Sequence, residues 1–226
     1  MVAENASIKD AIESLGVPHT EVEAMTVNGI PVGFSYRLQS GDETAVYPDR
    51  DVPGNASLPS LRSPSPSPAL FICDVHLGRL GRLLRLLGFD TLFRNDYTDS
   101  EIAAIARQQG RIVLTRDRGL LKRSEVTHGY CVRSDNALVQ AKEVLRRFDL
   151  SGETDPFTRC AECNGMILTV EKSAVVELLE EKTRRYYDDF FRCSGCGRVY
   201  WEGSHFLKLK VLVEELIKPE EGIHKI

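Results

Sequence analysis

Aspartates follow the apolar runs that should form parallel strands in the middle third of this 226-residue chain. Asp74 comes directly after the first such run, Asp117 lies two residues after the third, and Asp135 lies two residues after the fourth. Parallel strands end at one edge of a sheet, and ligands bind in the crevice beyond that edge. Clustered carboxylates repel one another, and Mg²⁺ or Mn²⁺ relieves the repulsion through the oxygen ligands that these ions prefer. Two such ions can promote attack of water on a phosphodiester, so the arrangement predicts a nuclease.

Aspartates near helix starts also cap helices without any catalytic role. Thr98, Asp99 and Glu101 would form such a cap in a protein of any function. Asp74 and Asp117 fit the capping interpretation least, because both follow strongly apolar strands. These two aspartates are therefore the strongest catalytic candidates from the residues alone.

Basic residues near the aspartates can hold the phosphates of a nucleic acid. Arg116 and Arg118 flank Asp117, and the planar fork of a guanidinium matches a phosphate group. The helix expected after the first strand carries an arginine stripe at residues 79, 82 and 85, which either binds substrate or is only solvated. The candidate substrate contacts are Arg79, Arg82, Arg116, Arg118 and Lys122.

Four of the six cysteines form two C-x-x-C pairs, which is the spacing of metal-binding knuckles. Cys160 pairs with Cys163, and Cys193 pairs with Cys196. A glycine follows each pair, and a tight turn there lets two thiolates reach one ion. The pairs predict a structural Zn²⁺ held by four cysteines, with an iron site or a redox dithiol as the alternative. Helical spacing within 175–179 predicts a helix in the 29 residues between the pairs.

The sequence around the second cysteine pair offers positive charge and aromatic stacking surface for nucleic acid. The residues are Arg192, Arg198, Tyr200 and Trp201. The aromatic residues would serve equally well by packing against the knuckle. The two remaining cysteines, Cys73 and Cys131, lie in expected strands and are predicted to be buried and inert.

Residues 71–150 alternate short β-rich runs with helical runs, which predicts an α/β domain with a parallel sheet. The expected strands are 70–73, 91–93, 111–115 and 130–133. The expected helices are 77–87, ended by Gly88, then 98–110, and finally 136–148.

Composition divides the chain into four segments. Residues 53–68 hold five of the ten prolines and five serines, which predicts an extended linker between separately folded pieces. Turn-forming residues at 151–156 mark a second boundary. We therefore expect an N-terminal module (1–52), a linker (53–69), an α/β domain (70–150) and a zinc-ribbon domain with a C-terminal helix (151–226).

The net charge of −4 argues at first against a nucleic-acid partner. By segment, however, the net charge is −5 for residues 1–70, +4 for 71–150 and −3 for 151–226. The basic centre is compatible with RNA. No apolar run approaches the ~18 residues of a membrane span, and residues 1–10 do not form a basic, apolar leader, so we expect a cytoplasmic protein without membrane contact.

Several motifs together carry a resemblance to a known family. They are 74–78 (DVHLG), 83–90 (LLRLLGFD), 99–101 (DSE), 114–117 (LTRD), 132–135 (VRSD) and 198–205 (RVYWEGSH). These segments resemble the PIN-like RNase domain named after the C-terminus of a mutator exonuclease, which is often followed by a zinc ribbon. The resemblance implies a PIN fold, metal-dependent RNA cleavage, and Asp74, Asp99, Asp117 and Asp135 as the acidic set. Asp96 remains the alternative to Asp99, because mainly the resemblance favours Asp99.

The N-terminal segment resembles the ubiquitin-like, sulfur-carrier-like β-grasp module that precedes such RNase domains, through 16–22 (GVPHTEV), Asn28-Gly29 and 41–48 (GDETAVYP). One helix over 8–15 and strands near 25–27 and 45–47 are expected. A β-grasp fold begins with a hairpin, whereas this chain opens almost at the helix, so a partial module is expected. We expect it to bind or dock a protein partner rather than to take part in conjugation, with an inactive remnant as the alternative.

Two hypotheses follow for the whole chain. In the first, it is a ribonuclease in which the four aspartates hold Mg²⁺ or Mn²⁺ and the zinc ribbon extends the RNA-binding surface. In the second, it is a non-catalytic RNA-binding or adaptor protein that uses the ribbon and the ubiquitin-like module. Replacement of Asp74 and Asp117 by asparagine would separate the two.

Overall fold

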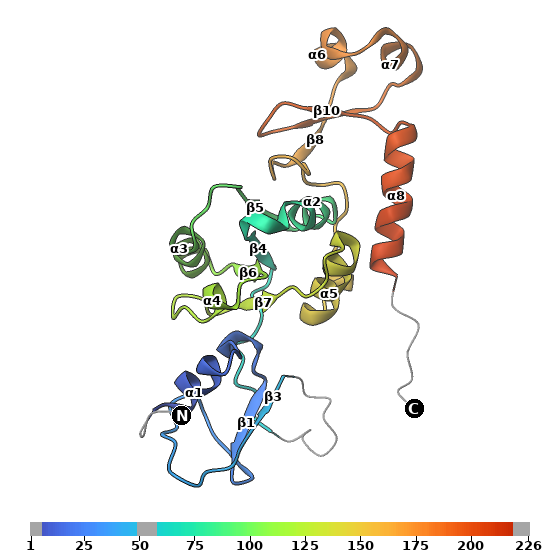
Figure 1. Cartoon of the computed structure of the whole chain (residues 1–226). Coiled ribbons are helices and arrows are strands. Elements are labelled where there is room, and N and C mark those ends of the chain that lie inside the picture. The colour runs from blue at the N-terminus through green and yellow to red at the C-terminus, as the bar shows by residue number, and fades with distance from the viewer. Residues whose placement is uncertain (1–5, 49–57, 219–226) are drawn as a thin grey trace. The chain divides into compact units, whose positions relative to one another are not determined.

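The computed structural model describes residues 6–48 and 58–218 (Figure 1). It divides into two compact units, one formed by residues 1–76 and 94–132 and the other by residues 77–93 and 133–226. The first five residues of the predicted linker, 53–57, lie outside the described residues. In the part of the chain that is described, none of the helices has the length and apolar character needed to cross a membrane.

A four-stranded sheet with the strand order β5-β4-β6-β7 forms the centre of the α/β fold, as the sequence predicts. Its strands are β4 (Leu70–Cys73), β5 (Asp90–Phe93), β6 (Ile112–Thr115) and β7 (Gly129–Cys131). The β4–β6 and β6–β7 pairs are parallel, with Phe71 opposite Ile112 and Val113 opposite Gly129. Every residue of β6 is buried, as expected for a strand with neighbours on both sides.

Two helices of the first unit flank β6 along the chain. The helix α3 (Asp99–Gln109) begins with a capping box: the Thr98 side chain accepts from the Glu101 backbone N–H, and the Glu101 side chain accepts from the Thr98 backbone N–H. The helix ends at Gly110, which has φ +65°. This confirms the predicted helix. The short helix α4 (Arg118–Leu121) follows β6 and was not expected from the sequence, because its four residues are too few to show a helical period.

The N-terminal module consists of a three-stranded antiparallel sheet and one α-helix. Its elements are α1 (Ile8–Ser14), the 3₁₀-helix η1 (His19–Glu21), β1 (Ala24–Val27), β2 (Ile30–Pro31) and β3 (Thr44–Tyr47), with strand order β2-β1-β3. The core contains Ile8, Ile12, Val22, Met25 and Val27. The sequence missed β2, whose two residues are exposed and include a proline, both unusual in a strand.

Two residues of the described part of the predicted linker, Leu61 and Arg62, pack on the N-terminal module, whereas most of its other described residues are exposed. Leu61 contacts the apolar core of the module, and its backbone N–H donates to the Glu23 carbonyl over 2.7 Å. Arg62 forms an ion pair with Glu23 at 3.1 Å. A leucine and an arginine within a proline-rich segment are the residues that make this contact possible.

The same module is hydrogen-bonded to the sheet of its unit. The Glu21 carboxylate accepts from the Cys131 backbone N–H over 2.8 Å, and the ring of His19 lies 3.1 Å from the Val126 carbonyl oxygen. The first compact unit therefore unites the N-terminal module with strands β4, β6 and β7.

The second unit contains two helices from the α/β segment together with the cysteine-rich region. Here α2 (Gly78–Leu86) packs against α5 (Ala137–Phe148), which contacts the C-terminal helix α8 (Ser204–Ile217). Gly88 has φ +96° and ends α2, as predicted, and the backbone of Asp155 lies where a β-carbon would be. A short 3₁₀-helix, η3 (Ser151–Glu153), follows α5 at the predicted boundary.

The cysteine-rich region is an antiparallel ribbon with strand order β10-β9-β8. Its elements are β8 (Ile167–Val170), α6 (Lys172–Val175), η4 (Val176–Leu178), α7 (Glu181–Tyr186), β9 (Phe190–Cys193) and β10 (Val199–Tyr200). The prediction of one helix between the cysteine pairs was wrong, because β8 and several short helices occupy this insert. Val175, Leu179 and Phe190 form its small core.

Arg85 joins α2 to the first cysteine knuckle. The residue is buried, and its guanidinium donates to the carbonyl oxygens of Thr91, Ala161 and Glu162 over 2.8, 3.2 and 2.8 Å. The Asn164 side chain adds hydrogen bonds with Thr91 and Asp90 of β5. The third arginine of the predicted stripe thus has a structural role, and it does not lie on a solvated face.

Candidate functional site

Asp74 is the buried aspartate of the first unit. It directly follows β4 and is 6% exposed. Its Oδ2 accepts from the Thr115 hydroxyl over 2.7 Å, and its Oδ1 accepts from the Val75 backbone N–H over 2.6 Å. Its own N–H donates to the Leu114 carbonyl over 2.9 Å and continues the β4–β6 ladder. The Val75 backbone and the Thr115 side chain therefore hold the Asp74 carboxylate in one orientation.

Thr115 links Asp74 to Asp117. While its hydroxyl donates to Asp74, its oxygen accepts from the Asp117 backbone N–H over 2.8 Å. From the sequence, Thr115 is only one residue of the motif 114–117 and has no predicted role. The register could have identified it, because Cys73 lies opposite Leu114 and the next residues along the two strands are Asp74 and Thr115.

Asp117 is exposed and caps a helix. Its Oδ1 accepts from the Gly119 backbone N–H over 2.6 Å, which makes Asp117 the N-cap of α4. The sequence made Asp117 one of the two aspartates that fit the capping interpretation least, but the structure makes it a cap, because the unexpected helix α4 begins directly after it. Capping uses one carboxylate oxygen and leaves acceptor capacity on the other.

Asp96 and Asp99 differ in what they already bind. Both oxygens of Asp96 accept from the Arg94 guanidinium, over 2.9 and 2.6 Å, and these hydrogen bonds lower the pKa of Asp96. Asp99 is exposed at the first position of α3, which packs against β6. Among the described residues, no hydrogen bond or ion pair engages the Asp99 side chain. Asp99 is the more available of the two carboxylates for a ligand.

The basic candidates of the first unit surround Asp117 in the sequence and lie on or near α4. Arg116 and Arg118 are exposed, and Lys122 is half-buried at the C-terminus of α4. The Arg118 guanidinium also donates to the Gly16 carbonyl oxygen of the N-terminal module over 3.5 Å. Positive charge thus flanks the Thr115–Asp117 turn.

The remaining predicted site residues belong to the second unit. Asp135 is exposed and lies two residues before the first residue of α5. Arg79 and Arg82 are exposed on α2, and Arg82 forms an ion pair with Glu162 of the first knuckle at 3.0 Å.

The four predicted zinc cysteines converge, with all four Sγ atoms within 4.8 Å of one another. The Sγ atoms of Cys163 and Cys193 are 3.3 Å apart, and those of Cys160 and Cys196 are 3.8 Å apart. Four thiolates at this spacing match the donor set of a structural Zn²⁺ site. Within residues 6–48 and 58–218, no aspartates or glutamates form a second group of three at so short a spacing.

Tyr200 is a structural part of this cysteine cluster. Its hydroxyl lies 3.0 Å from Cys160 Sγ. Burial alone would raise the pKa of Cys160, but hydrogen bonds from Tyr200 and from backbone N–H groups of the knuckle outweigh it and lower the pKa to about 7. Of the two uses considered for this aromatic residue, the structure therefore supports packing on the knuckle.

Two family models match the chain. The Mut7-C RNAse domain matches residues 69–213, and the Mut7-C ubiquitin model matches residues 1–52. A segment of 115 residues is 37% identical to the exonuclease mut-7 homolog of Homo sapiens, covering 48% of this chain and 13% of that protein. The chain thus spans only a small part of that relative. No solved structure matches significantly.

Proposed function

Since the chain belongs to the family of the Mut7-C RNAse domain, we propose that it is a divalent-metal-dependent ribonuclease. The observation that carries the proposal is the coupling of two carboxylate residues of the family-matched segment. The buried Asp74 and the exposed Asp117 share hydrogen bonds with Thr115 at the ends of neighbouring parallel strands. Ligand sites of parallel sheets lie at this edge.

The proposed metal-binding residues are Asp74, Asp99, Asp117 and Asp135. Carboxylate oxygens fit the preference of Mg²⁺ and Mn²⁺ for hard ligands, and such ions keep several waters, so their protein ligands need not contact one another. When bound, the ions supply Lewis-acid stabilisation of charge and make water a stronger nucleophile. The hydrogen bonds to Thr115 and Val75 keep the Asp74 oxygens oriented and still leave lone pairs for a ligand.

The reaction is a hydrolysis of the RNA backbone. A water oxygen forms a bond to phosphorus, the bond from phosphorus to one ribose oxygen breaks, and that leaving oxygen takes up a proton. Arg116, Arg118 and Lys122 would hold phosphate groups on either side of the scissile bond, and Arg79 and Arg82 are proposed as further substrate contacts. Each of these side chains is exposed or half-buried, as a substrate contact requires.

Zinc would be held by Cys160, Cys163, Cys193 and Cys196 as a structural ion. A set of four thiolates leaves no open coordination position for substrate, in contrast to a catalytic zinc site. The ubiquitin-like module would offer its surface to a protein partner.

A cleavage assay tests the proposed function. The purified protein, with its zinc retained, should degrade labelled RNA only when Mg²⁺ or Mn²⁺ is added, and mapping the product ends reports whether it cuts internally or from an end. Ca²⁺ at the same concentration serves as a control for ionic effects. Tight RNA binding without cleavage in either metal would contradict the proposal and favour the adaptor hypothesis.

Replacing Thr115 by valine tests the coupling of the two aspartates. The change removes the donor to Asp74 and the acceptor of the Asp117 N–H, so we expect a loss of about 1–3 kcal/mol of stability and a cleavage rate about 10- to 100-fold lower. Thr115→Ser keeps the hydroxyl and should restore most of both. Denaturant unfolding and cleavage rates are the measurements, with Thr127→Val at an exposed position as the control. An unchanged cleavage rate in Thr115→Val would show that the coupling has no role.

A further inference from the structure

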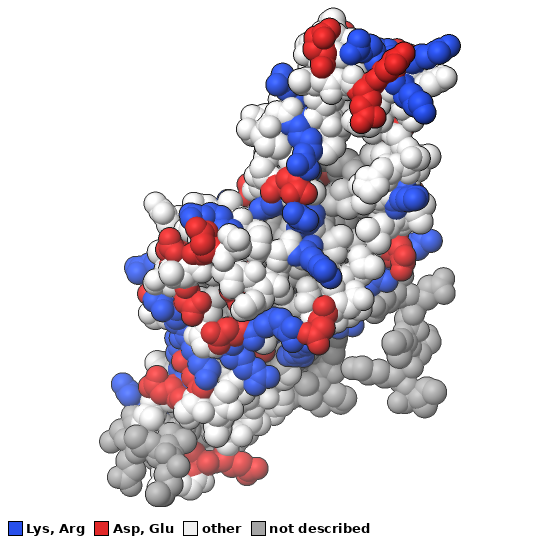
Figure 2. All heavy atoms as spheres, turned by 45° about the horizontal axis from the view of Figure 1, so that its top comes forward, with Lys and Arg blue, Asp and Glu red and all other residues white. Residues whose placement is uncertain are grey.

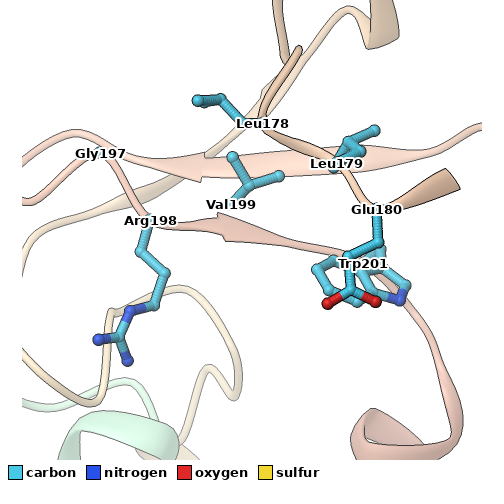
Figure 3. Close-up of a pocket in the computed structure, with 7 residues that line it drawn as sticks. All are labelled: Leu178, Leu179, Glu180, Gly197, Arg198, Val199 and Trp201. Atoms are coloured by element: carbon cyan, nitrogen blue, oxygen red, sulfur yellow. The ribbon is translucent and has the colours of Figure 1, made fainter. Parts of the chain in front are cut away.

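The ribbon contains an open cavity of about 430 Å³ that has no part in the proposed chemistry (Figure 3). It lies between the segment 178–180, which connects η4 to α7, and the segment that runs from the second cysteine knuckle along β10. Its lining residues are Leu178, Leu179, Glu180, Gly197, Arg198, Val199 and Trp201. Leucine and valine side chains make part of this lining apolar, with polar groups beside it.

Trp201 and Glu180 are the two distinctive lining residues, and Figure 3 draws them at the same end of the cavity. Trp201 is 37% exposed although it is large and apolar. The Tyr187 ring lies next to the Trp201 ring, with ring centroids 6.4 Å apart and the ring planes tilted by 50°. Glu180 is the N-cap residue of α7, but its side chain makes no capping hydrogen bond. A flat aromatic surface and a carboxylate that does not cap its helix thus line the same cavity.

In the second unit, arginine side chains lie at the cavity, near it and on α2. Arg198 lines the cavity and lies 3.7 Å from Glu162, which also pairs with Arg82 of α2 at 3.0 Å. Arg79 is one turn earlier on α2, and the Arg192 guanidinium donates to the carbonyl of Gly197 over 3.2 Å. We call Arg79, Arg82, Arg192 and Arg198 the arginine track.

The arginine track has a net positive charge, because the single carboxylate of Glu162 forms ion pairs with two of its four guanidinium groups. Figure 2 shows that basic and acidic side chains both occur on the face of the molecule that it draws. A polyanion suits such a track, whereas a basic peptide would be repelled by it.

We propose that the cavity binds one unstacked base of a single-stranded RNA whose phosphates follow the arginine track. The proposal rests on the proposed function and adds a substrate subsite to it. Proteins that bind single-stranded nucleic acid combine basic grooves with aromatic side chains on which bases stack, and Trp201 beside the track has this combination. The apolar residues of the lining would contact the remaining surface of the base.

Glu180 predicts which bases the cavity prefers. A carboxylate accepts hydrogen bonds from exocyclic amino groups, as in the pairing of glutamate with the cytosine amino group. Cytosine, adenine and guanine carry such a group, whereas uracil does not. We therefore expect oligo(U) to bind less tightly than oligo(C) or oligo(A) of the same length, and Glu180→Ala to reduce the difference.

Trp201 is the single tryptophan of the chain, so its fluorescence reports directly on the cavity. In the experiment, single-stranded 12-nucleotide RNA is titrated into the full-length, zinc-loaded Asp74→Asn protein without Mg²⁺ or Mn²⁺, so that cleavage does not interfere. We expect the RNA to quench the fluorescence of Trp201 saturably. The affinity from this quenching should equal the affinity measured independently from the anisotropy of a labelled RNA. RNA binding by anisotropy without any change in Trp201 fluorescence would overturn the proposal.

Variants separate the cavity from general charge. Trp201→Ala should weaken RNA binding about 5- to 100-fold, which corresponds to the loss of one base stack. The matched control is Tyr186→Ala, which removes another exposed aromatic residue of the ribbon that does not line the cavity. Equal zinc content and equal circular dichroism show that each variant is folded, and Trp201→Phe, which keeps an aromatic face, should recover most of the affinity. Equal affinity of Trp201→Ala and Tyr186→Ala would overturn the proposal.

The track is tested by salt. Arg198→Ala should lower the slope of log affinity against log salt concentration by about 0.7, the value for one phosphate contact of a single strand. Lys208→Ala on α8, also exposed and in the same unit, should leave the slope unchanged. These binding results are independent of cleavage. A wild-type protein that never cuts RNA would contradict the proposed nuclease function but not the proposed base site. If the protein cuts RNA and Trp201→Ala binds RNA as tightly as the wild type, only the proposed base site is contradicted.

Discussion

Asp74→Asn should lower the rate of RNA cleavage by more than about 100-fold. Asp74 is a proposed metal ligand, and loss of a direct ligand should cost more than the roughly 10- to 100-fold that follows loss of a residue that only orients a ligand. The substitution keeps the shape of the side chain and removes its charge. The asparagine oxygen can still accept from Val75, and its amide group can donate to Thr115. Folding stability should therefore change by no more than about 1–2 kcal/mol. Cleavage rates and denaturant unfolding of the two proteins, purified side by side, are the measurements.

The matched controls use the other acidic residues. Asp99→Asn should also impair cleavage strongly, whereas Asp96→Asn should have little effect on it, because the Asp96 carboxylate is already occupied by Arg94 at the surface. If Asp74→Asn cleaves RNA at the wild-type rate in Mg²⁺ and Mn²⁺, Asp74 is not a catalytic residue. If Asp96→Asn is inactive and Asp99→Asn is active, the metal ligand near α3 is Asp96.

Removal of zinc, or Cys193→Ser, should unfold the ribbon. Its core is only a few residues, among them Val175, Leu179 and Phe190, whereas binding of a structural zinc supplies on the order of 10 kcal/mol. We expect one zinc ion per wild-type chain, and none or a weakly held one in Cys193→Ser. Limited proteolysis should then cut within 160–200 of the variant and of the chelator-treated protein, but not of the zinc-loaded protein.

Cys131→Ser provides the control for cysteine replacement, since Cys131 lies in β7 and takes no part in the cluster. It should retain one zinc ion and the protease resistance of the ribbon. A Cys193→Ser protein with full zinc content and unchanged proteolysis would contradict the assignment of Cys193 as a ligand. Iron in place of zinc in the purified wild-type protein would favour the iron alternative.

The sequence predicted the features that depend on local pattern. The four strands of the central sheet, the Thr98 cap and the Gly88 stop follow from apolar runs and from residues with specific backbone preferences. The cysteine cluster was equally accessible, because the C-x-x-C spacing encodes the knuckle itself. These predictions succeeded because each is decided by a few neighbouring residues.

The features that the sequence did not predict depend on partners far away in the chain. Arg85 has the same spacing as Arg79 and Arg82, and only the position of the knuckle carbonyls makes it a buried anchor. Thr115 acquires its role from the register between β4 and β6. Leu61 and Arg62 leave the solvated linker expected from composition because the ubiquitin-like module offers them a core contact and an acidic partner.

The anchoring of the first knuckle by Arg85 affects how this protein can be dissected. Residue 150 ends the predicted α/β domain (70–150), and cutting there is the natural way to obtain that domain alone. Such a fragment would keep Arg85 in α2 but lose the Ala161 and Glu162 carbonyls that it binds. The Thr91 backbone N–H would lose Asn164 at the same time. The zinc ribbon thus folds together with the segment that precedes it. Misfolding or inactivity of the shortened chain would therefore give no information about its catalytic residues.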